Sequence, residues 1–243
     1  MSRKTCTVVA CLTMLLSTKA GATDTCYRGG DLLPNYLLNG SASLSGNNIL
    51  VTPDLEDQNS SVMFNPTFSS TGDIHLKLVF QITTTTGSGA DGWAFVLHSD
   101  PRGAAAIGSP GEGIGYGEQS GTVSTKISPS VAVELDTYRN TSRNDPSDNH
   151  IGITVDGSPT HGSGANRNLP TYDLNASDMV LKSNTPMYAW LDYTASNSRL
   201  RVYLSDSNSK PGTALLSTTR INFEARLGPT FMMGFTGSTG GAR

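Results

Sequence analysis

The sequence predicts an all-β domain folded as an antiparallel β-sandwich, and three observations carry that prediction. Short runs of alternating apolar and polar residues recur along most of the 243 residues, which is typical of strands with one buried face. Turn formers separate these runs, since the chain holds 26 Gly and 12 Pro. Charged residues make up only 15% of the chain, too few for a helical bundle or a coiled coil.

Each predicted strand shows the two-residue period. In residues 74–82 the apolar side chains of Ile74, Leu76 and Leu78 alternate with mostly polar ones, and Trp93 lies on the apolar side of the next such run. Further strands are predicted at residues 131–135, 151–155, 187–191 and 200–204. A turn at residues 195–198 separates the last two strands and predicts a hairpin.

Charge and composition exclude several classes of protein. The formal net charge is −3, from 17 Lys and Arg against 20 Asp and Glu, and no basic block is present, which argues against a nucleic-acid binder. Apolar residues make up 36%, too many for a disordered chain. No apolar run is long enough to span a membrane.

The first 22 residues are typical of a secretory signal peptide. Arg3 and Lys4 supply a positive start, residues 8–16 are largely apolar, and residues 20–22 form a small-x-small cleavage site before Thr23. We therefore expect a protein that is secreted to the cell exterior, or to the periplasm in a bacterium.

Residues 23–243 are predicted to form one domain. Cleavage would remove Cys6 and Cys11, so Cys26 would have no cysteine within the mature chain with which to form a disulfide. We expect an unpaired or intermolecular thiol there, since no neighbouring pattern indicates a catalytic cysteine.

The most informative segment begins at residue 131 and reads Val-Ala-Val-Glu-Leu-Asp-Thr-Tyr-Arg-Asn. In a strand, Glu134, Asp136, Tyr138 and Asn140 share the face opposite the apolar residues. Two carboxylates two residues apart on one face repel each other unless a cation lies between them. The alternative is an ordinary polar strand face followed by a solvated acidic loop.

Asp145 and His150 follow the same segment and extend the set of possible ligands. Oxygen ligands from Asp136, Asn140, Asp145 and a carbonyl at Tyr138 suit Ca²⁺. Adding the His150 imidazole to carboxylates suits a transition metal such as Mn²⁺. An EF-hand loop is disfavoured because Thr141 stands where that loop needs glycine.

This segment, followed by Asp-Pro-Ser at 145–147 and His-Ile-Gly-Ile at 150–153, closely resembles the metal-binding segment of the L-type (legume-type) lectin family. Further resemblances occur in family order and cover most of the chain from about residue 38. They are Leu-Asn-Gly-Ser-Ala at 38–42, the aspartate loop Gly-Ala-Asp-Gly-Trp-Ala-Phe-Val-Leu at 89–97, the glycine loop Gly-Glu-Gly-Ile-Gly at 111–115, and the C-terminal loop Gly-Phe-Thr-Gly-Ser-Thr-Gly at 234–240.

The resemblance implies a concanavalin-like jelly roll with two metal ions that shape a sugar site and perform no chemistry. Matched position by position, the ligands of Mn²⁺ or a similar transition metal are Glu134, Asp136, Asp145 and His150. Those of Ca²⁺ are Asp136, the Tyr138 carbonyl, Asn140 and Asp145.

The resemblance also implies a set of carbohydrate-binding residues. Asp91, preceded by a cis peptide, would accept hydrogen bonds from two sugar hydroxyls, and the Asn140 amide would donate one. The Tyr138 ring would stack on the sugar. A backbone N–H would come from Glu112, whose side chain would narrow the pocket or reach the ligand, and the C-terminal loop would start near Gly237.

These residues together predict a secreted, Ca²⁺-dependent lectin without enzymatic activity, which binds glycans of mannose or glucose type and can form homo-oligomers. One alternative is a glycoside hydrolase of the same architecture. Its Glu-x-Asp motif begins at Glu134, but its closing glutamate is missing, since Tyr138 and Arg139 stand at the possible positions. Another is an adhesion or structural module with a decayed sugar site, which the presence of Asp91 and Asn140 disfavours.

The C-terminus departs from the family pattern. L-type lectins normally add an apolar strand after the C-terminal loop, whereas this sequence stops at Arg243. The resemblance therefore implies either a fragment or a rear sheet that lacks an edge-closing strand and is less stable.

Overall fold

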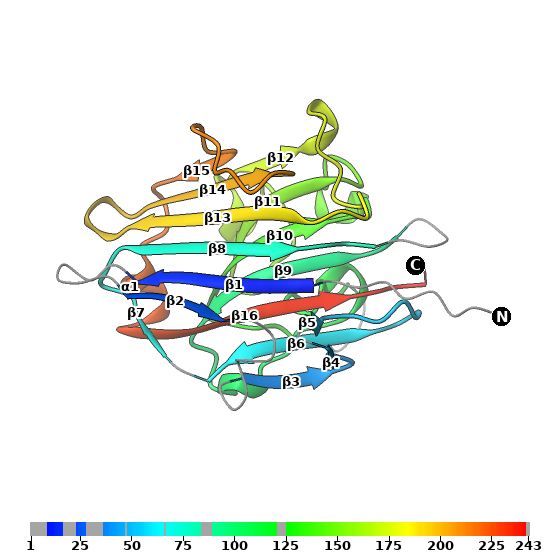
Figure 1. Cartoon of the computed structure of the whole chain (residues 1–243), viewed down its shortest axis with the longest axis horizontal. Coiled ribbons are helices and arrows are strands. Elements are labelled where there is room, and N and C mark those ends of the chain that lie inside the picture. Colours follow the sequence, from blue (N-terminus) through cyan, green and yellow to red (C-terminus); the bar gives the residue numbers. More distant parts are fainter. Residues whose placement is uncertain are drawn as a thin grey trace.

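The computed structural model describes residues 9–16, 23–27, 36–46, 48–65, 67–83, 89–120 and 125–241, with 9–16 and 23–27 described by their backbone alone. The strands form two antiparallel sheets, and most run along the long axis of the molecule (Figure 1). The predicted all-β antiparallel sandwich is therefore confirmed.

The sheet that bears the site, called the front sheet, has β9, β10 and β16 at its centre. Its strands in spatial order are β12 (Thr171–Asp173), β11 (His150–Val155), β10 (Ser130–Asp136), β9 (Gly92–His98), β16 (Thr230–Ser238), β6 (Asn59–Phe64) and β3 (Tyr36–Gly40), with β7 (Phe68–Ser69) also paired to β16.

The second sheet, called the rear sheet, is built mainly on β8, β13 and β14. Its strands in spatial order are β15 (Leu216–Thr218), β14 (Arg199–Ser205), β13 (Met187–Thr194), β8 (Ile74–Phe80), β1 (Val9–Leu16), β5 (Asn48–Leu50) and β4 (Ser43–Ser45), with β2 (Thr23–Tyr27) also paired to β1.

Helical structure in the described residues is short. The α-helix α1 (Phe223–Leu227) begins at Asn222, whose side chain accepts a hydrogen bond from the Ala225 N–H and caps the first turn. The 3₁₀ turns are η1 (Gly103–Ala105), η2 (Gly111–Gly113), η3 (Thr141–Arg143), η4 (Gly164–Asn166), η5 (Leu174–Ala176) and η6 (Ala195–Asn197). None of the described helices is long and apolar enough to cross a membrane.

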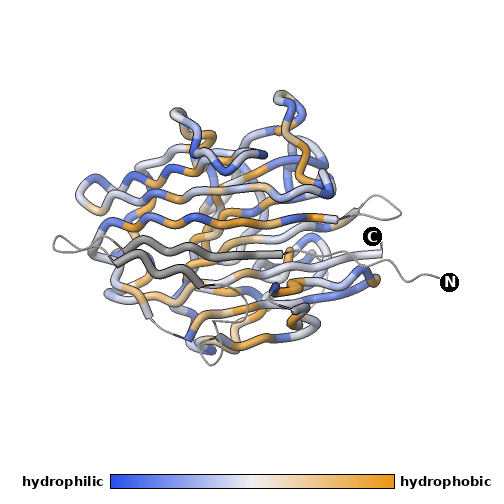
Figure 2. The backbone as a smooth tube through the Cα atoms, in the orientation of Figure 1, coloured by the Kyte–Doolittle hydropathy of each residue, from blue (hydrophilic) through white to orange (hydrophobic). Residues whose placement is uncertain are grey.

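Aromatic side chains from both sheets form the centre of the core. Trp93 and Phe95 of β9 and Phe235 of β16 are buried together with Phe80 of β8. The Phe80 and Trp93 ring centroids lie 4.7 Å apart at 60°, an edge-to-face arrangement across the two sheets. Figure 2 shows the alternation of apolar and polar positions along the strands that places these residues inside. The prediction that Trp93 is a core residue is confirmed.

The predicted hairpin is confirmed as β13 and β14. Ala189 pairs with Leu204 and Leu191 with Val202, as the alternation of apolar residues requires. Trp190 points to the opposite face of the rear sheet, where its ring stacks on Tyr188.

β1 lies inside the rear sheet, next to β8. It pairs with β8 through Cys11–Val79 to Leu15–His75 and with β5 through Val9–Leu50 and Ala10–Ile49. β1 lies within the predicted signal peptide, whose residues 1–8 and 17–22 are outside the described part. The signal peptide stays a prediction, and cleavage before Thr23 would remove β1 from its place beside β8.

Asp100, just after β9, fixes the conformation of the segment that follows this strand. Its carboxylate accepts hydrogen bonds from the Arg102 backbone N–H (3.0 Å), from two guanidinium nitrogens of Arg102 (both 2.8 Å) and from the Ser128 N–H (3.0 Å). Burial opposes ionisation of the carboxyl, but the bonds from Arg102 and Ser128 outweigh it, and the pKa of Asp100 falls to about 2.

We therefore expect Asp100→Asn to lower the free energy of unfolding by about 2 kcal/mol at pH 7, the scale of hydrogen bonds to a charged group. Because the folded-state pKa is depressed, this stabilisation is present above about pH 4 and is lost as the pH falls through about 2. Urea unfolding of both proteins between pH 7 and pH 2 measures it, with the exposed Asp206→Asn as control. A difference between wild type and variant that stays constant across this range would contradict the assignment.

Candidate functional site

Strand β10 carries the site because its side chains divide between two faces. Val133 and Leu135 face the core, while Glu134 and Asp136 lie on the opposite face and are nevertheless buried. Asp136 pairs directly with His150, the first residue of β11, so the β10–β11 loop leaves and returns at the same point of the sheet. The loop therefore folds back over the carboxylates.

Asp136 and Asp145 each use one oxygen to hold this loop and turn the other toward His150. Asp136 Oδ1 accepts from the Tyr138 N–H (2.7 Å), and its Oδ2 lies 4.0 Å from His150 Nε2. Asp145 Oδ2 accepts from the Asn140 N–H (2.6 Å), and its Oδ1 lies 3.8 Å from His150 Nε2. Ligand atoms of Asp136, Asp145 and His150 all lie within 4.8 Å of one another, close enough to bind a metal ion.

The electrostatics of the cluster favour a bound cation. Burial, and then the charges of Asp145 and Glu134, raise the pKa of Asp136 well above its ordinary value. Burial also raises the pKa of Asp145 to about 6. Carboxylates held this close in a buried place disfavour each other's ionisation, and a cation between them removes that cost.

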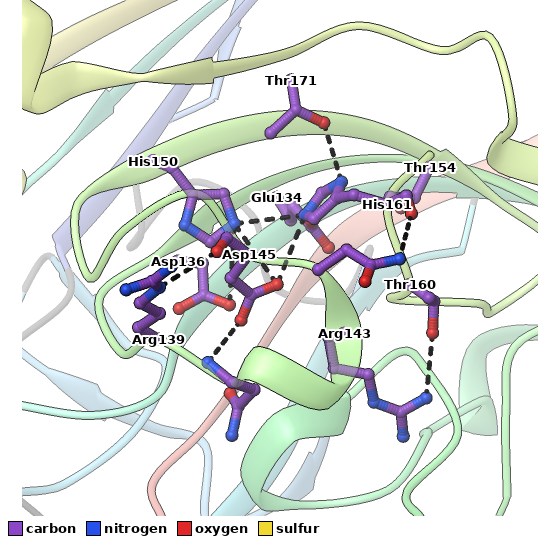
Figure 3. Close-up of polar contacts among 12 residues, drawn as sticks. Glu134, Asp136, Arg139, Arg143, Asp145, His150, Thr154, Thr160, His161 and Thr171 are labelled. Atoms are coloured by element: carbon purple, nitrogen blue, oxygen red, sulfur yellow. Dashed lines mark hydrogen bonds and ion pairs between the residues drawn. The ribbon is translucent and has the colours of Figure 1, made fainter. Parts of the chain in front are cut away.

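A residue that the sequence analysis missed completes the cluster. His161 Nε2 lies 2.6 Å from Glu134 Oε1 and 3.1 Å from His150 Nε2, and the three residues form a second group of possible metal ligands (Figure 3). The motif of residues 131–153 does not indicate His161, because His161 lies in the loop that follows it. One sequence signal was available, Gly152 within an otherwise apolar and β-branched strand, because a glycine there indicates a close approach by another group.

The buried candidate ligands Glu134 and His150 are held by hydrogen bonds to residues outside the cluster. The Tyr116 hydroxyl donates to Glu134 Oε2 (2.5 Å) and also contacts the Thr154 hydroxyl (2.8 Å). Burial, together with the charge of Glu134, raises the pKa of Tyr116 well above its ordinary value, so this hydroxyl keeps its proton. His150 Nδ1 donates to the Ser147 carbonyl (2.8 Å), which directs Nε2 into the cluster.

Asn140 provides a second sign of a missing partner. Its backbone is tied to Asp145, but its Oδ1 is buried without a hydrogen bond among the described residues. Buried polar atoms are nearly always satisfied, so an unpaired amide oxygen beside two carboxylates indicates a place for a cation.

Asp91 lies against the same loop from the other side. Its N–H donates to the Ser238 carbonyl (3.1 Å) and its carbonyl accepts from the Thr137 N–H (2.8 Å), so it joins the end of β16 to the end of β10. The peptide between Ala90 and Asp91 is cis, as the resemblance implied. Gly92 follows with φ 141°, where an added Cβ would lie 2.3 Å from the Leu135 carbonyl oxygen.

The Asp91 carboxyl is buried and incompletely satisfied. Only 5% of the residue is exposed, and Oδ2 has no hydrogen bond from the described residues. Burial, followed by the charges of Glu112 and Asp57, raises the pKa of Asp91 to about 7. The site therefore holds an acceptor that lacks its donors.

The side chain of Glu112 makes an ion pair that joins two loops. Its Oε1 lies 2.7 Å from Arg143 Nη2 and also accepts from the Ser120 N–H (2.7 Å). Arg143 belongs to η3 in the β10–β11 loop, so this ion pair ties the glycine loop to the loop that holds the carboxylates. Spacing along the sequence contains no sign of this pair, because the two residues are far apart in the chain.

The C-terminal loop, expected to start near Gly237, begins after Ser238. Gly237 lies inside β16 and pairs with Ser60 and Trp93, and the strand continues through Ser238. The loop residue beside Asp91 is Gly240, where an added Cβ would lie 2.9 Å from Asp91 Oδ2. The cause is the strand register, which keeps β16 paired on both sides beyond the point where the sequence suggests a turn.

Tyr138 is exposed, with 39% of its surface accessible. Tyr138 lines a depression of about 590 Å³, together with residues that include Arg139, Pro146 and Asp173. The ring is thus free to meet a ligand from solvent.

Comparison with known proteins gives matches along most of the chain. The model of the legume lectin domain matches residues 36–243. Among curated proteins, a probable L-type lectin-domain containing receptor kinase S.7 of Arabidopsis thaliana is 32% identical over 76% of this chain and 25% of its own length. The receptor kinase VIII.1 of the same plant is 30% identical over 95% of this chain and 32% of its own length. The chain thus spans only about a quarter to a third of these relatives.

Solved structures show the same fold. The metal-free form of lectin I-B4 from Griffonia simplicifolia superposes with a TM-score of 0.66 at 24% identity, over 86% of this chain and 88% of that one. A lectin from Bauhinia forficata in complex with GalNAc gives 0.67 at 19% identity, over 94% and 91%. Together with the family match over residues 36–243, these findings show that the chain belongs to the legume lectin domain family.

Proposed function

We propose that this protein is a secreted, non-catalytic lectin that binds glycans in a Ca²⁺-dependent way. The observation that carries the proposal is a pair of buried, unsatisfied oxygens, Asp91 Oδ2 and Asn140 Oδ1, on segments joined through the Asp91–Thr137 hydrogen bond. Asp91 Oδ2 suits sugar hydroxyls and Asn140 Oδ1 suits a cation. Because the hydrogen bond joins their two segments, cation binding and sugar binding are coupled.

In this proposal Ca²⁺ is bound by Asp136, the Tyr138 carbonyl, Asn140 and Asp145. A neighbouring transition metal, Mn²⁺ or a similar ion, is bound by Glu134, Asp136, Asp145 and His150. Both ions would neutralise carboxylates that otherwise repel each other and would hold the β10–β11 loop in place. Neither ion takes part in a reaction.

The sugar would meet the loops around Asp91. Asp91 Oδ2 would accept hydrogen bonds from sugar hydroxyls, the Asn140 amide would donate one, and the Tyr138 ring would stack on the apolar face of the pyranose. The backbone N–H of Glu112 would complete the set, with the loop from Gly240 as the outer wall. We take mannose- and glucose-type glycans as the first ligands to test.

Affinity for a single sugar is expected to be weak. An open site with a few hydrogen bonds and one stacking contact gives a Kd of about a millimolar. Clustered glycans or a homo-oligomer would then raise the apparent affinity through multivalency.

The glycoside hydrolase alternative has little support in the site. A retaining enzyme needs its nucleophile in contact with the sugar, and a second carboxyl group about 5 Å away. Glu134 is 1% exposed, with one oxygen bonded to Tyr116 and the other against His161. Tyr138 and Arg139 stand where the second carboxylate would be needed.

A glycan array probed with Ca²⁺, with EDTA, and with Ca²⁺ restored after EDTA tests the proposal. We expect binding with Ca²⁺, its loss with EDTA and its recovery on restoring the ion. Binding that persists unchanged in EDTA would reject the Ca²⁺-dependent mechanism. Release of reducing sugar from bound oligosaccharides would instead support the hydrolase.

A further inference from the structure

We propose that His161 is an additional ligand of the transition metal, which makes the site a two-imidazole site and shifts its selectivity from Mn²⁺ toward Zn²⁺. This inference rests on the metal sites of the proposed function and not on sugar binding. It concerns a side chain that lies outside the ligand set expected from the family resemblance.

The separation of the two ring nitrogens fits a shared ion. His161 Nε2 lies 3.1 Å from His150 Nε2, and the rings stand at 78° to each other. Two nitrogen ligands at about 2.1 Å from one metal, in neighbouring positions of a tetrahedron or octahedron, lie about 3.0–3.4 Å apart. Asp145 Oδ1 faces the same point, 3.7 Å from His161 Nε2 and 3.8 Å from His150 Nε2.

The outer nitrogens of both rings have the partners that metal-binding histidines normally have. His150 Nδ1 bonds to the Ser147 carbonyl, and His161 Nδ1 lies 2.8 Å from the Thr171 hydroxyl oxygen. A ring that donates through Nδ1 presents a lone pair at Nε2. Both lone pairs would then point into the same space (Figure 3).

Glu134 distinguishes this arrangement from a simple ion pair. Although His161 Nε2 is only 2.6 Å from Glu134 Oε1, that oxygen is buried without an aligned hydrogen bond, while Tyr116 occupies Oε2. An ion pair that served only to stabilise the fold would aim the N–H at the carboxylate. Oε1 thus has no aligned donor and can bind an ion together with His161 Nε2.

The fold keeps a place for the His161 ring. Gly152 pairs with Glu134, and an added Cβ at Gly152 would lie 2.6 Å from His161 Cε1. The His161 backbone is also fastened, because its N–H donates to the Arg143 carbonyl (2.8 Å) and its carbonyl accepts from the Asn144 amide (2.9 Å). The residue is 5% exposed, so the ring is held in position before any ion binds.

Ligand chemistry then determines the preferred ion. Carboxylates suit Mn²⁺, whereas imidazole suits Zn²⁺ and the later divalent metals. Exchanging an oxygen ligand or a water for a second imidazole therefore favours Zn²⁺. Because most sites prefer Zn²⁺ over Mn²⁺ to some degree, the informative quantity is how far His161 changes that preference.

The test is calorimetric titration of the metal-stripped full chain with Zn²⁺ and with Mn²⁺, in saturating Ca²⁺, for wild type and His161→Gln. We expect the substitution to weaken Zn²⁺ binding by a factor of about 100, at or above the effect of outer-shell changes. Mn²⁺ binding should change much less. His75→Gln, on the rear sheet, is the matched control and should bind both ions as wild type does.

Pulsed electron paramagnetic resonance of Cu²⁺-loaded wild type provides a readout that does not depend on a variant's folding, because it counts the imidazoles bound to the ion. Two imidazoles are expected. One imidazole, or an equal loss of Zn²⁺ and Mn²⁺ affinity in His161→Gln, would overturn the proposal. Since neither measurement uses a sugar, failure of glycan binding would leave this inference standing and would be recognised separately.

Discussion

Asp91→Asn is expected to abolish glycan binding while leaving the fold intact. The amide would present an N–H₂ group or a weaker acceptor where the proposed site needs a carboxylate that accepts from two hydroxyls. Hydrogen bonds to a charged group contribute about 1.5–3 kcal/mol, so the loss of one is expected to weaken a millimolar interaction by at least tenfold and put it beyond detection. Glycan-array signal and titration with the best monosaccharide measure the effect.

Stability separates this effect from misfolding. The folded-state pKa of Asp91 is raised to about 7, so its contribution to stability is lost as the pH rises from about 4 through 7, and the buried carboxylate is a cost at pH 8. The neutral amide avoids that cost, and Asp91→Asn should therefore unfold at the same temperature as wild type or higher at pH 8. Full glycan binding by Asp91→Asn would remove Asp91 from the sugar site.

Metal removal is expected to produce the largest change in stability. Without cations, Glu134, Asp136 and Asp145 remain buried against one another, and the raised pKa of Asp136 reflects its burial and then that repulsion. An ion that binds only the folded state, at a concentration a thousand times its Kd, stabilises that state by about 4 kcal/mol. For a domain of this size, each kcal/mol moves the Tm by about 2–4 °C, so EDTA should lower the Tm by about 10 °C.

Scanning calorimetry with EDTA and with restored ions measures this shift. Asp136→Asn is the informative variant, because it removes a shared ligand and also relieves repulsion in the metal-free protein. Its Tm should respond to EDTA much less than that of wild type, whereas Asp206→Asn on the exposed surface should respond as wild type does. An identical Tm for wild type with and without EDTA would show that the cluster binds no structural ion.

Much of the front sheet and its candidate site could be predicted, because the patterns that indicate them involve residues close together in the chain. A two-residue period divides Val133 and Leu135 from Glu134 and Asp136 on any strand, whatever its neighbours. The alternation also identified Trp93 as a core residue and β13–β14 as a hairpin, since both depend on residues close together in the chain. The candidate metal ligands from Glu134 to His150 are likewise contained within one hairpin.

Other parts were decided by contacts between distant segments. Gly237 belongs to β16 rather than to a loop because Ser60 and Trp93 pair with it from two different strands. Glu112 is turned to Arg143 across two loops, and β1, which lies within the predicted signal peptide, pairs with β8.

The sequence by itself thus determined the fold class, the family and the candidate ligands on β10, because strand alternation and short motifs are properties of neighbouring residues. Only the tertiary structure decided that His161 faces His150 and that Gly240 lies beside Asp91. The first depends on the space that Gly152 leaves free beside Glu134, and the second on the pairing of β16 with β6 and β9. Gly152 signals a close approach in the sequence but does not identify the residue that approaches.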